Sequence, residues 1–209
     1  MPAADPGADR YRLAGERIDA ANAEDPTEVE IEGERGPKEL LHGRWMVRTV
    51  LELDPDAGEL QLLAARAHHL RRWTSPRTDH PEGRAGYLRW RAAARRRHAE
   101  EVRDLLGACG YTDAEAATVA AIVRKEGLGT DPAVQVHEDA LCLVFLRTQL
   151  GEVSARLGED HMVDVLVRTL PKMSDRGRAA AAGLPLDEAG RELLARAVAT
   201  WTAGDATPG

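Results

Sequence analysis

The sequence predicts an all-α protein with at least seven helices. Aromatic residues make up only 4% of its 209 residues, so the core is built mainly from Leu, Val and Ala, a composition that favours helices. Apolar residues recur at helical spacing along most of the chain. Start signals separate these stretches, among them a capping box from Thr112 to Glu115 and the pair Asp131-Pro132.

The N-terminal half begins with a helix expected at residues 10–23. An acidic segment follows at 26–37, and its short alternating stretch suggests a brief strand or an extended loop. Two helices are then expected at 38–53 and 59–73, separated by a turn that contains Pro55 and Gly58. The polar loop at 74–83 is stiffened by two prolines.

The C-terminal half is also helical by pattern. A long helix is expected at 84–109 with Gly110 after it, and a second at 113–126 behind the capping box. Asp131 caps the next helix, which carries Glu138 and Asp139. Further helices are expected at 159–170 and 187–201. We therefore expect a single domain over 10–201, with flexible tails at 1–9 and 202–209.

Charge and composition limit the class of protein. The net charge of -7 makes nucleic acid an unlikely partner. No apolar run approaches the roughly 18 residues of a membrane span, and no signal peptide is visible. The two cysteines are widely spaced, which fits a reducing compartment. We therefore expect a cytoplasmic protein. Residues 66–103 differ from the rest, because they hold eleven arginines and only four acidic residues. Arginine binds phosphate and carboxylate in a bidentate way.

Histidines provide the most specific chemical signal. The doublet His68-His69 lies in an apolar stretch that otherwise indicates a buried helix, with His42 one predicted helix earlier and His98 one helix later. Neutral imidazole and carboxylate are common ligands of divalent metals. Because neighbours on a helix point about 100° apart, His68 and His69 are not expected to point the same way. The other histidines in polar surroundings are expected at the surface: His80, His137 and His161.

This order of residues resembles the HD-domain superfamily of metal-dependent phosphohydrolases, over about residues 38 to 150. His42 is similar to the first ligand of that family and His68 to the His of its His-Asp pair, with His69 in place of the Asp. His98 is similar to a second-metal ligand, and Asp139 to the final Asp. The resemblance implies an HD-like helical bundle, in a divergent family of unknown function, whose metal ligands are His42, His68, His69, His98 and Asp139.

The resemblance also implies an activity: hydrolysis of a small phosphorylated substrate, for example a nucleotide, by metal-activated water. The expected cofactor is a divalent metal (Mn, Zn, Mg, Co or Fe). With His69 in place of the Asp, either Glu138 takes over the carboxylate role, or the site binds metal with altered chemistry, or it is degenerate. Lys125 is a further candidate for contact with the anion. The expected substrate-binding residues follow the doublet: Arg72, Arg77, Arg84, Tyr87 and Arg91.

Two other functions are compatible with the same residues. A histidine-rich ligand set also suits iron, as in HD-like di-iron oxygenases. A non-catalytic helical module could instead use the arginine-rich stretch to bind an anionic partner such as RNA. Residues 179–182 and the last helix would suit either core packing or a homodimer contact.

Overall fold

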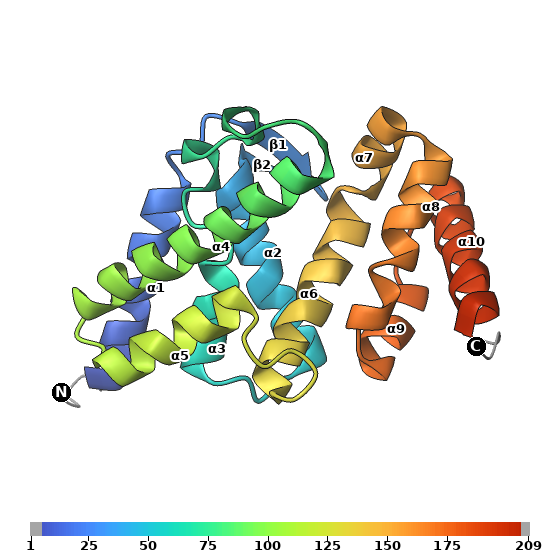
Figure 1. Ribbon diagram of the computed structural model, residues 1–209. Coiled ribbons are helices and arrows are strands. Elements are labelled where there is room, and N and C mark those ends of the chain that lie inside the picture. The colour runs from blue at the N-terminus through green and yellow to red at the C-terminus, as the bar shows by residue number, and fades with distance from the viewer. Residues whose placement is uncertain (1–5, 206–209) are drawn as a thin grey trace. The chain divides into compact units, whose positions relative to one another are not determined.

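A computed structural model describes residues 6–205, which form two compact units, one ending at Gly127 and one beginning at Leu128 (Figure 1). Helices reach into both expected tails, because the first begins at Pro6 and the last ends at Asp205. The remainder of those tails, 1–5 and 206–209, lies outside the described residues. The single-domain expectation stays a prediction.

The first unit is mainly helical, as expected. Helices α4 and α5 run side by side (Figure 1), while α3 packs against α1, α2 and α5. Its fully buried side chains include Ile18, Met46, Leu63 and Leu106, so aliphatic residues build the core. The elements of this unit are α1 (Pro6–Asn22), β1 (Glu28–Ile31), β2 (Glu34–Pro37), α2 (Lys38–Leu53), α3 (Glu59–Arg66), α4 (Gly83–Gly107) and α5 (Asp113–Arg124), with short 3-10 turns at Arg72–Thr74 and Arg77–Asp79.

The acidic segment forms a hairpin of two strands, where the sequence suggested one brief strand or an extended loop. Strands β1 and β2 pair antiparallel, with Ile31 opposite Glu34. The two residues between them, Glu32 and Gly33, both have positive φ, 49° and 81°. This conformation is typical of a type I′ turn, whose twist matches that of the strands, and Gly33 adopts it without strain. The all-α expectation is therefore corrected to mostly helical.

The helix starts in the middle of the chain follow the capping signals. Thr112 accepts a hydrogen bond from the backbone N–H of Glu115, and the Glu115 side chain accepts from Thr112, so the capping box is confirmed. Asp131 accepts from the backbone N–H groups of Ala133 and Val134 at the start of α6, which confirms that cap as well. Helix α5 ends at Arg124, because Lys125 takes the left-handed conformation.

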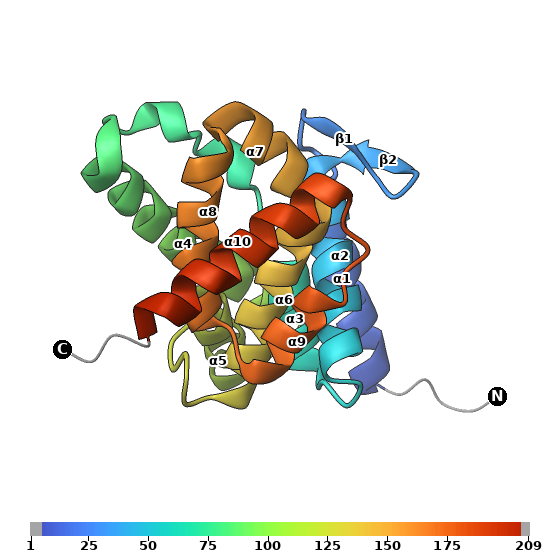
Figure 2. The same cartoon turned by 90° about the vertical axis from the view of Figure 1, so that its right-hand side faces the viewer.

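The second unit contains two helices that the sequence analysis did not predict, α7 and α9. Helix α6 packs against α7 and α9, and α8 packs against α10 (Figures 1 and 2). The bounds of the helices in this unit are α6 (Pro132–Thr148), α7 (Leu150–Leu157), α8 (Glu159–Val167), α9 (Asp175–Ala182) and α10 (Glu188–Asp205), with a 3-10 turn at Leu170–Lys172.

The apolar content is spread among amphipathic helices. Among the described residues, every helix is too short or too polar to cross a membrane. Cys109 and Cys142 are both buried and do not form a disulfide with each other, as expected of small core residues.

Candidate metal and anion site

Helix α2 places two polar side chains of the first unit in the protein interior. Glu39 and His42 are three residues apart, so they lie on one face of the helix, and each is only 4% exposed. Gly43 follows at a point of very close approach: a Cβ at this position would lie 2.6 Å from the carbonyl oxygen of Arg66. The lack of a side chain at Gly43 therefore lets α2 meet the end of α3 directly beside His42.

The histidine doublet lies beyond the end of α3. The expected helix 59–73 is wrong after Arg66, where the chain enters a turn with Ala67 at the C-cap. Arg71 then takes a left-handed conformation with a φ of 49°, and its backbone N–H donates to Asn22 Oδ1 at 3.2 Å. The doublet is therefore not held to helical directions, and the ring centroids of His68 and His69 lie 4.5 Å apart.

Helix α4 supplies the fourth imidazole. His98 is 2% exposed, and its Nδ1–H donates to the carbonyl oxygen of Leu70 at 2.8 Å. This bond fixes the tautomer, so that Nε2 carries no hydrogen and has a free lone pair. His98 Nε2 is buried without a hydrogen-bond partner among the described atoms.

The four predicted histidine ligands are brought together in one cluster. His42 and His69 are stacked, with centroids 4.2 Å apart and an interplanar angle of 12°. His68 lies 6.1 Å from His42, and His98 lies 6.1 Å from His69, measured between ring centroids. His42 Nε2 is, like that of His98, buried with no hydrogen-bond partner in the described part of the chain. We call these four residues the histidine cluster.

A chain of hydrogen bonds fixes the orientation of His69. Arg72 Nη1 lies 2.8 Å from His69 Nε2, and Glu39 Oε2 lies 3.0 Å from His69 Nδ1. Guanidinium can only donate, so Nε2 accepts and Nδ1–H donates to the Glu39 carboxylate. Carboxylates often orient metal-binding histidines in this way. The sequence analysis did not select Glu39. Its spacing of three residues from His42 on an otherwise apolar face was the available signal.

Burial controls the charge of the cluster. It lowers the pKa of His42 to about 3, with Arg72 and Lys38 adding to the effect. Burial, followed by nearby Arg97, lowers the pKa of His98 to about 3, and burial sets the pKa of His69 well below its usual range. These imidazoles are therefore neutral at pH 7, which is the form that binds metal.

Burial also acts on the two residues that bond His69. It raises the pKa of Glu39 to about 7, while the neighbouring cation of Arg72 opposes the shift. It lowers the pKa of Arg72, but the guanidinium stays charged at pH 7.

The donor types fit a transition metal, although their geometry is not that of a closed ligand set. Four imidazoles, two of them with unpartnered buried Nε2 atoms, provide nitrogen ligands of the kind that zinc, iron and cobalt bind. Among the described residues, no three His, Cys, Asp or Glu side chains are positioned to hold an ion together. The stacking of His42 on His69 implies that rings must rotate for their nitrogens to converge.

Beside the cluster, arginine and aromatic side chains alternate. The Arg72 guanidinium lies over the ring of Trp90, 4.8 Å from its centroid, and Trp90 Nε1–H donates to the Ser75 carbonyl at 2.9 Å. Tyr87 lies 5.9 Å from Trp90 between centroids and is 43% exposed. The guanidinium of Arg91 lies 5.6 Å from the Tyr87 centroid. Three of the expected substrate-binding residues, Arg72, Tyr87 and Arg91, thus belong to one neighbourhood.

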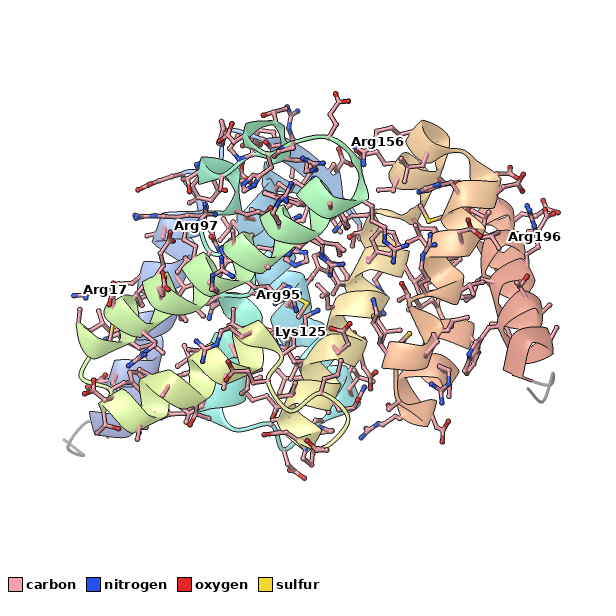
Figure 3. The ribbon with its side chains drawn as sticks, viewed as in Figure 1. Arg17, Arg95, Arg97, Lys125, Arg156 and Arg196 are labelled. Atoms are coloured by element: carbon pink, nitrogen blue, oxygen red, sulfur yellow. The ribbon has the colours of Figure 1, made fainter. Side chains whose placement is uncertain are left out.

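Several other arginines of the basic stretch have structural partners. Arg77 donates to the carbonyl oxygens of His80 and Pro81, both at 2.8 Å, and so holds its own loop together. Arg66 pairs with Asp19 through two bonds, at 2.7 and 3.0 Å. Arg97 on α4 (Figure 3) lies 3.3 Å from a Glu101 carboxylate oxygen. Arg84 is exposed at the start of α4. Some arginines of the basic stretch therefore stabilise the fold and are not available to bind a substrate.

The remaining predicted site residues belong to other elements of the chain. Asp139 is in the second unit, where it accepts hydrogen bonds from Ser174 N at 2.9 Å, from Ser174 Oγ at 2.5 Å and from Gln135 Nε2 at 3.1 Å. Glu138 is buried beside it on α6, and Lys125 follows the last residue of α5 in the first unit. The roles predicted for these three residues stay predictions. His137 was expected at the surface and is fully buried, which corrects that expectation.

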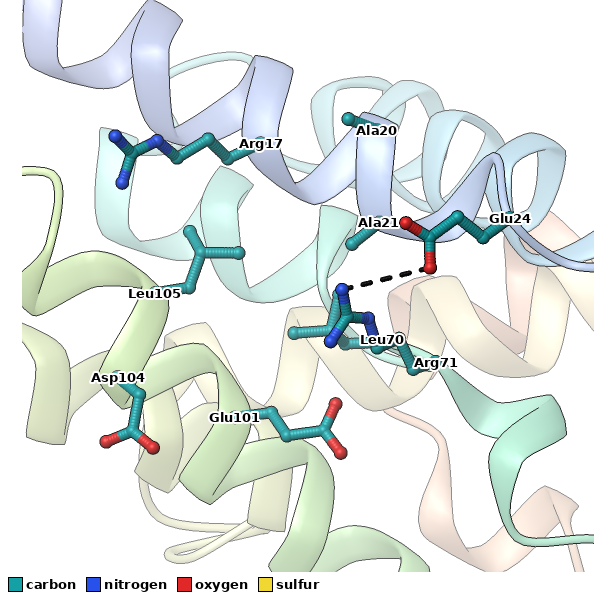
Figure 4. Close-up of a pocket in the computed structure, with 9 residues that line it drawn as sticks. All are labelled: Arg17, Ala20, Ala21, Glu24, Leu70, Arg71, Glu101, Asp104 and Leu105. Atoms are coloured by element: carbon teal, nitrogen blue, oxygen red, sulfur yellow. Dashed lines mark ion pairs between the residues drawn. The ribbon is translucent and has the colours of Figure 1, made fainter.

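A cavity of about 460 Å³ lies between α1, α4 and the segment that follows the doublet (Figure 4). No histidine lines it. Leu70 forms part of its wall, and Arg71 pairs with Glu24 across it at 3.9 Å. The cavity and the histidine cluster therefore meet at Leu70, which lines the cavity and accepts the hydrogen bond of His98.

Comparison with known proteins identifies a family but not an activity. Neither the curated proteins nor the solved structures gave a match. The family match does not connect the chain to HD domains, so that resemblance stays a prediction. One family model, described as a domain of unknown function, DUF4202, matches residues 12–194, and the chain belongs to that family.

Proposed function

We propose that the histidine cluster binds a divalent metal ion and that the chain hydrolyses a small phosphorylated substrate. The observation that carries this proposal is the pair of buried, unpartnered Nε2 atoms on His42 and His98. A buried polar atom without a partner costs about 1–3 kcal/mol, and native proteins rarely keep one without a reason. Two such atoms on neutral imidazoles in one cluster are well explained by a shared cation.

The ligands would be His42, His68, His69 and His98, with Glu39 orienting His69. This set is rich in nitrogen, whereas magnesium prefers oxygen ligands and retains water. We therefore favour zinc, cobalt or iron over magnesium and manganese. When bound, such an ion supplies Lewis acidity toward water and toward a phosphoryl oxygen.

Arginine and aromatic side chains support an anionic substrate. Arg72 lies in direct contact with the cluster and carries a positive charge at a partly buried position. Arg91 places a second guanidinium near Tyr87, whose exposed ring offers a flat apolar surface to an organic group. Arginines at this position would bind the phosphate and stabilise the charge that develops on it as the phosphorus–oxygen bond is cleaved.

Metal content tests the proposal most directly. Protein purified without chelator should contain about one or two equivalents of metal. His98→Asn should lose that metal yet stay folded, because the Asn amide can still donate to Leu70 O where His98 Nδ1 does, but has no counterpart of Nε2. His161→Asn is the matched control, since His161 is exposed on α8.

The identity of the metal then decides the chemistry. Zinc, manganese or cobalt, with release of phosphate in a phosphoester screen, would support hydrolysis. Iron with oxygen consumption would support the oxygenase alternative, which the nitrogen-rich cluster favours. A protein that neither contains metal nor takes it up would refute the metal site, and salt-sensitive RNA binding unchanged in His98→Asn would then point to the binding module.

A further inference from the structure

Arg72 uses the lone pair that a metal would need on His69. The Glu39 carboxylate holds the Nδ1–H of His69, so Nε2 is the nitrogen left for a ligand. Arg72 Nη1 donates to this nitrogen at 2.8 Å. One lone pair cannot bond a guanidinium N–H and a metal ion at the same time. Arg72 and a metal therefore compete for His69.

Arg72 has a second anchor that does not depend on His69. Its guanidinium lies 4.8 Å from the centroid of Trp90, and the Trp90 ring is fixed by its bond to Ser75 O. The residue itself opens a 3-10 turn directly after the left-handed Arg71. Arg72 can thus leave His69 while keeping its contact with the indole ring.

A displaced Arg72 would need an anion. It is a partly buried cation, the imidazoles around it are neutral, and the nearby Glu39 side chain already accepts the hydrogen bond of His69. Within the arginine-rich neighbourhood, a phosphate group would satisfy several guanidinium donors at once.

We propose that Arg72 is a latch that bonds His69 until metal displaces it and then binds the phosphate of the substrate, so that metal and phosphate strengthen each other's binding. This inference rests on the proposed metal site. Because coupling between two ligands is reciprocal, phosphate should raise zinc affinity by the same factor by which zinc raises phosphate affinity.

Calorimetric titration with Zn²⁺, in the absence and presence of inorganic phosphate, tests the latch. Arg72→Met keeps the aliphatic packing but has no N–H donor, and Arg72→Ala serves as a second variant. Both should bind Zn²⁺ about tenfold to a hundredfold more tightly than wild type, because no charged hydrogen bond has to break. In both, phosphate should no longer enhance Zn²⁺ binding. Arg71→Ala is the matched control, since Arg71 is an exposed neighbour that pairs with Glu24.

Tryptophan emission gives a readout that does not depend on activity. Zn²⁺ should change the emission of wild type, because the guanidinium over Trp90 shifts, and the change should be smaller in Arg72→Met and Trp90→Phe. If wild type binds Zn²⁺ through His98 and Arg72→Met binds it no more tightly, the latch is refuted and the metal site stands. If neither wild type nor any Arg72 variant binds Zn²⁺, the proposed function fails and the latch with it.

Discussion

Replacement of Gly43 by alanine tests the closest approach in the first unit. The new Cβ would lie 2.6 Å from the carbonyl oxygen of Arg66, about 0.7 Å closer than an ordinary carbon–oxygen contact. Both atoms are attached directly to backbone, so neither can move by a simple change of rotamer. Overpacking of this kind costs about 1–3 kcal/mol, and the better helix propensity of alanine returns about 1 kcal/mol. With the clash at the upper end of that range, we expect a net loss of about 2 kcal/mol.

Gly107→Ala is the matched control for this prediction. Gly107 is also helical and in the first unit, but nothing lies within 4 Å of a Cβ built there. This variant should be up to about 1 kcal/mol more stable than wild type. Urea unfolding followed by tryptophan emission suits the comparison, because three of the four tryptophans precede Gly127. Equal stability of Gly43→Ala and Gly107→Ala would show that α2 and α3 do not meet as closely as described.

Three further predictions concern other parts of the chain. Thr112→Ala removes the acceptor at the start of α5 and should lower the free energy of unfolding by about 1 kcal/mol in urea titrations. Hydrogen bonds from the Thr112 backbone N–H and hydroxyl, and then from Arg10, lower the pKa of Glu115 from its usual 4.5 to about 2. Wild type should therefore lose this stabilisation as the pH falls from 4.5 towards 2, because the carboxylate that makes these bonds becomes protonated. Glu115→Gln should not show this loss. Asp139→Ala leaves the backbone N–H and hydroxyl of Ser174 without their acceptor, so the amides of α9 should lose protection in hydrogen exchange.

Local sequence signals predicted most of the longer helices. The capping box and Asp131-Pro132 determine where two helices start. Their hydrogen bonds join residues only a few positions apart, so the pattern can be recognised in the sequence. Helices α7 and α9 have only eight residues each, too few for a clear period, so packing within the unit decides them. The end of α3 was mispredicted for a similar reason. The apolar pattern continues through Leu70, while the helix ends at Arg66 and the turn that follows is held by the bond from Arg71 to the distant Asn22.

The order of the four histidines along the chain was enough to predict that they lie close together, and the structure places them in one cluster. Their orientation was not predictable, because it depends on bonds between distant residues. Glu39 and His69 are thirty positions apart, and His98 meets Leu70 across twenty-eight. His137 was misassigned because its polar neighbours in sequence, Glu138 and Asp139, suggested a solvent-facing stretch but are themselves buried on α6.

Three irregular features of the first unit lie close to the histidine cluster. Gly43 permits the closest approach of α2 to α3, Arg71 carries a left-handed backbone directly after the doublet segment, and two buried imidazole nitrogens lack partners. Each of these departs from what stability alone would select, and apolar side chains could fill the same space without orphaned nitrogens. Departures from local rules that gather at one site are typical of a functional centre, because selection there acts on chemistry instead of packing. This coincidence supports a binding role for the cluster independently of any resemblance to a known family.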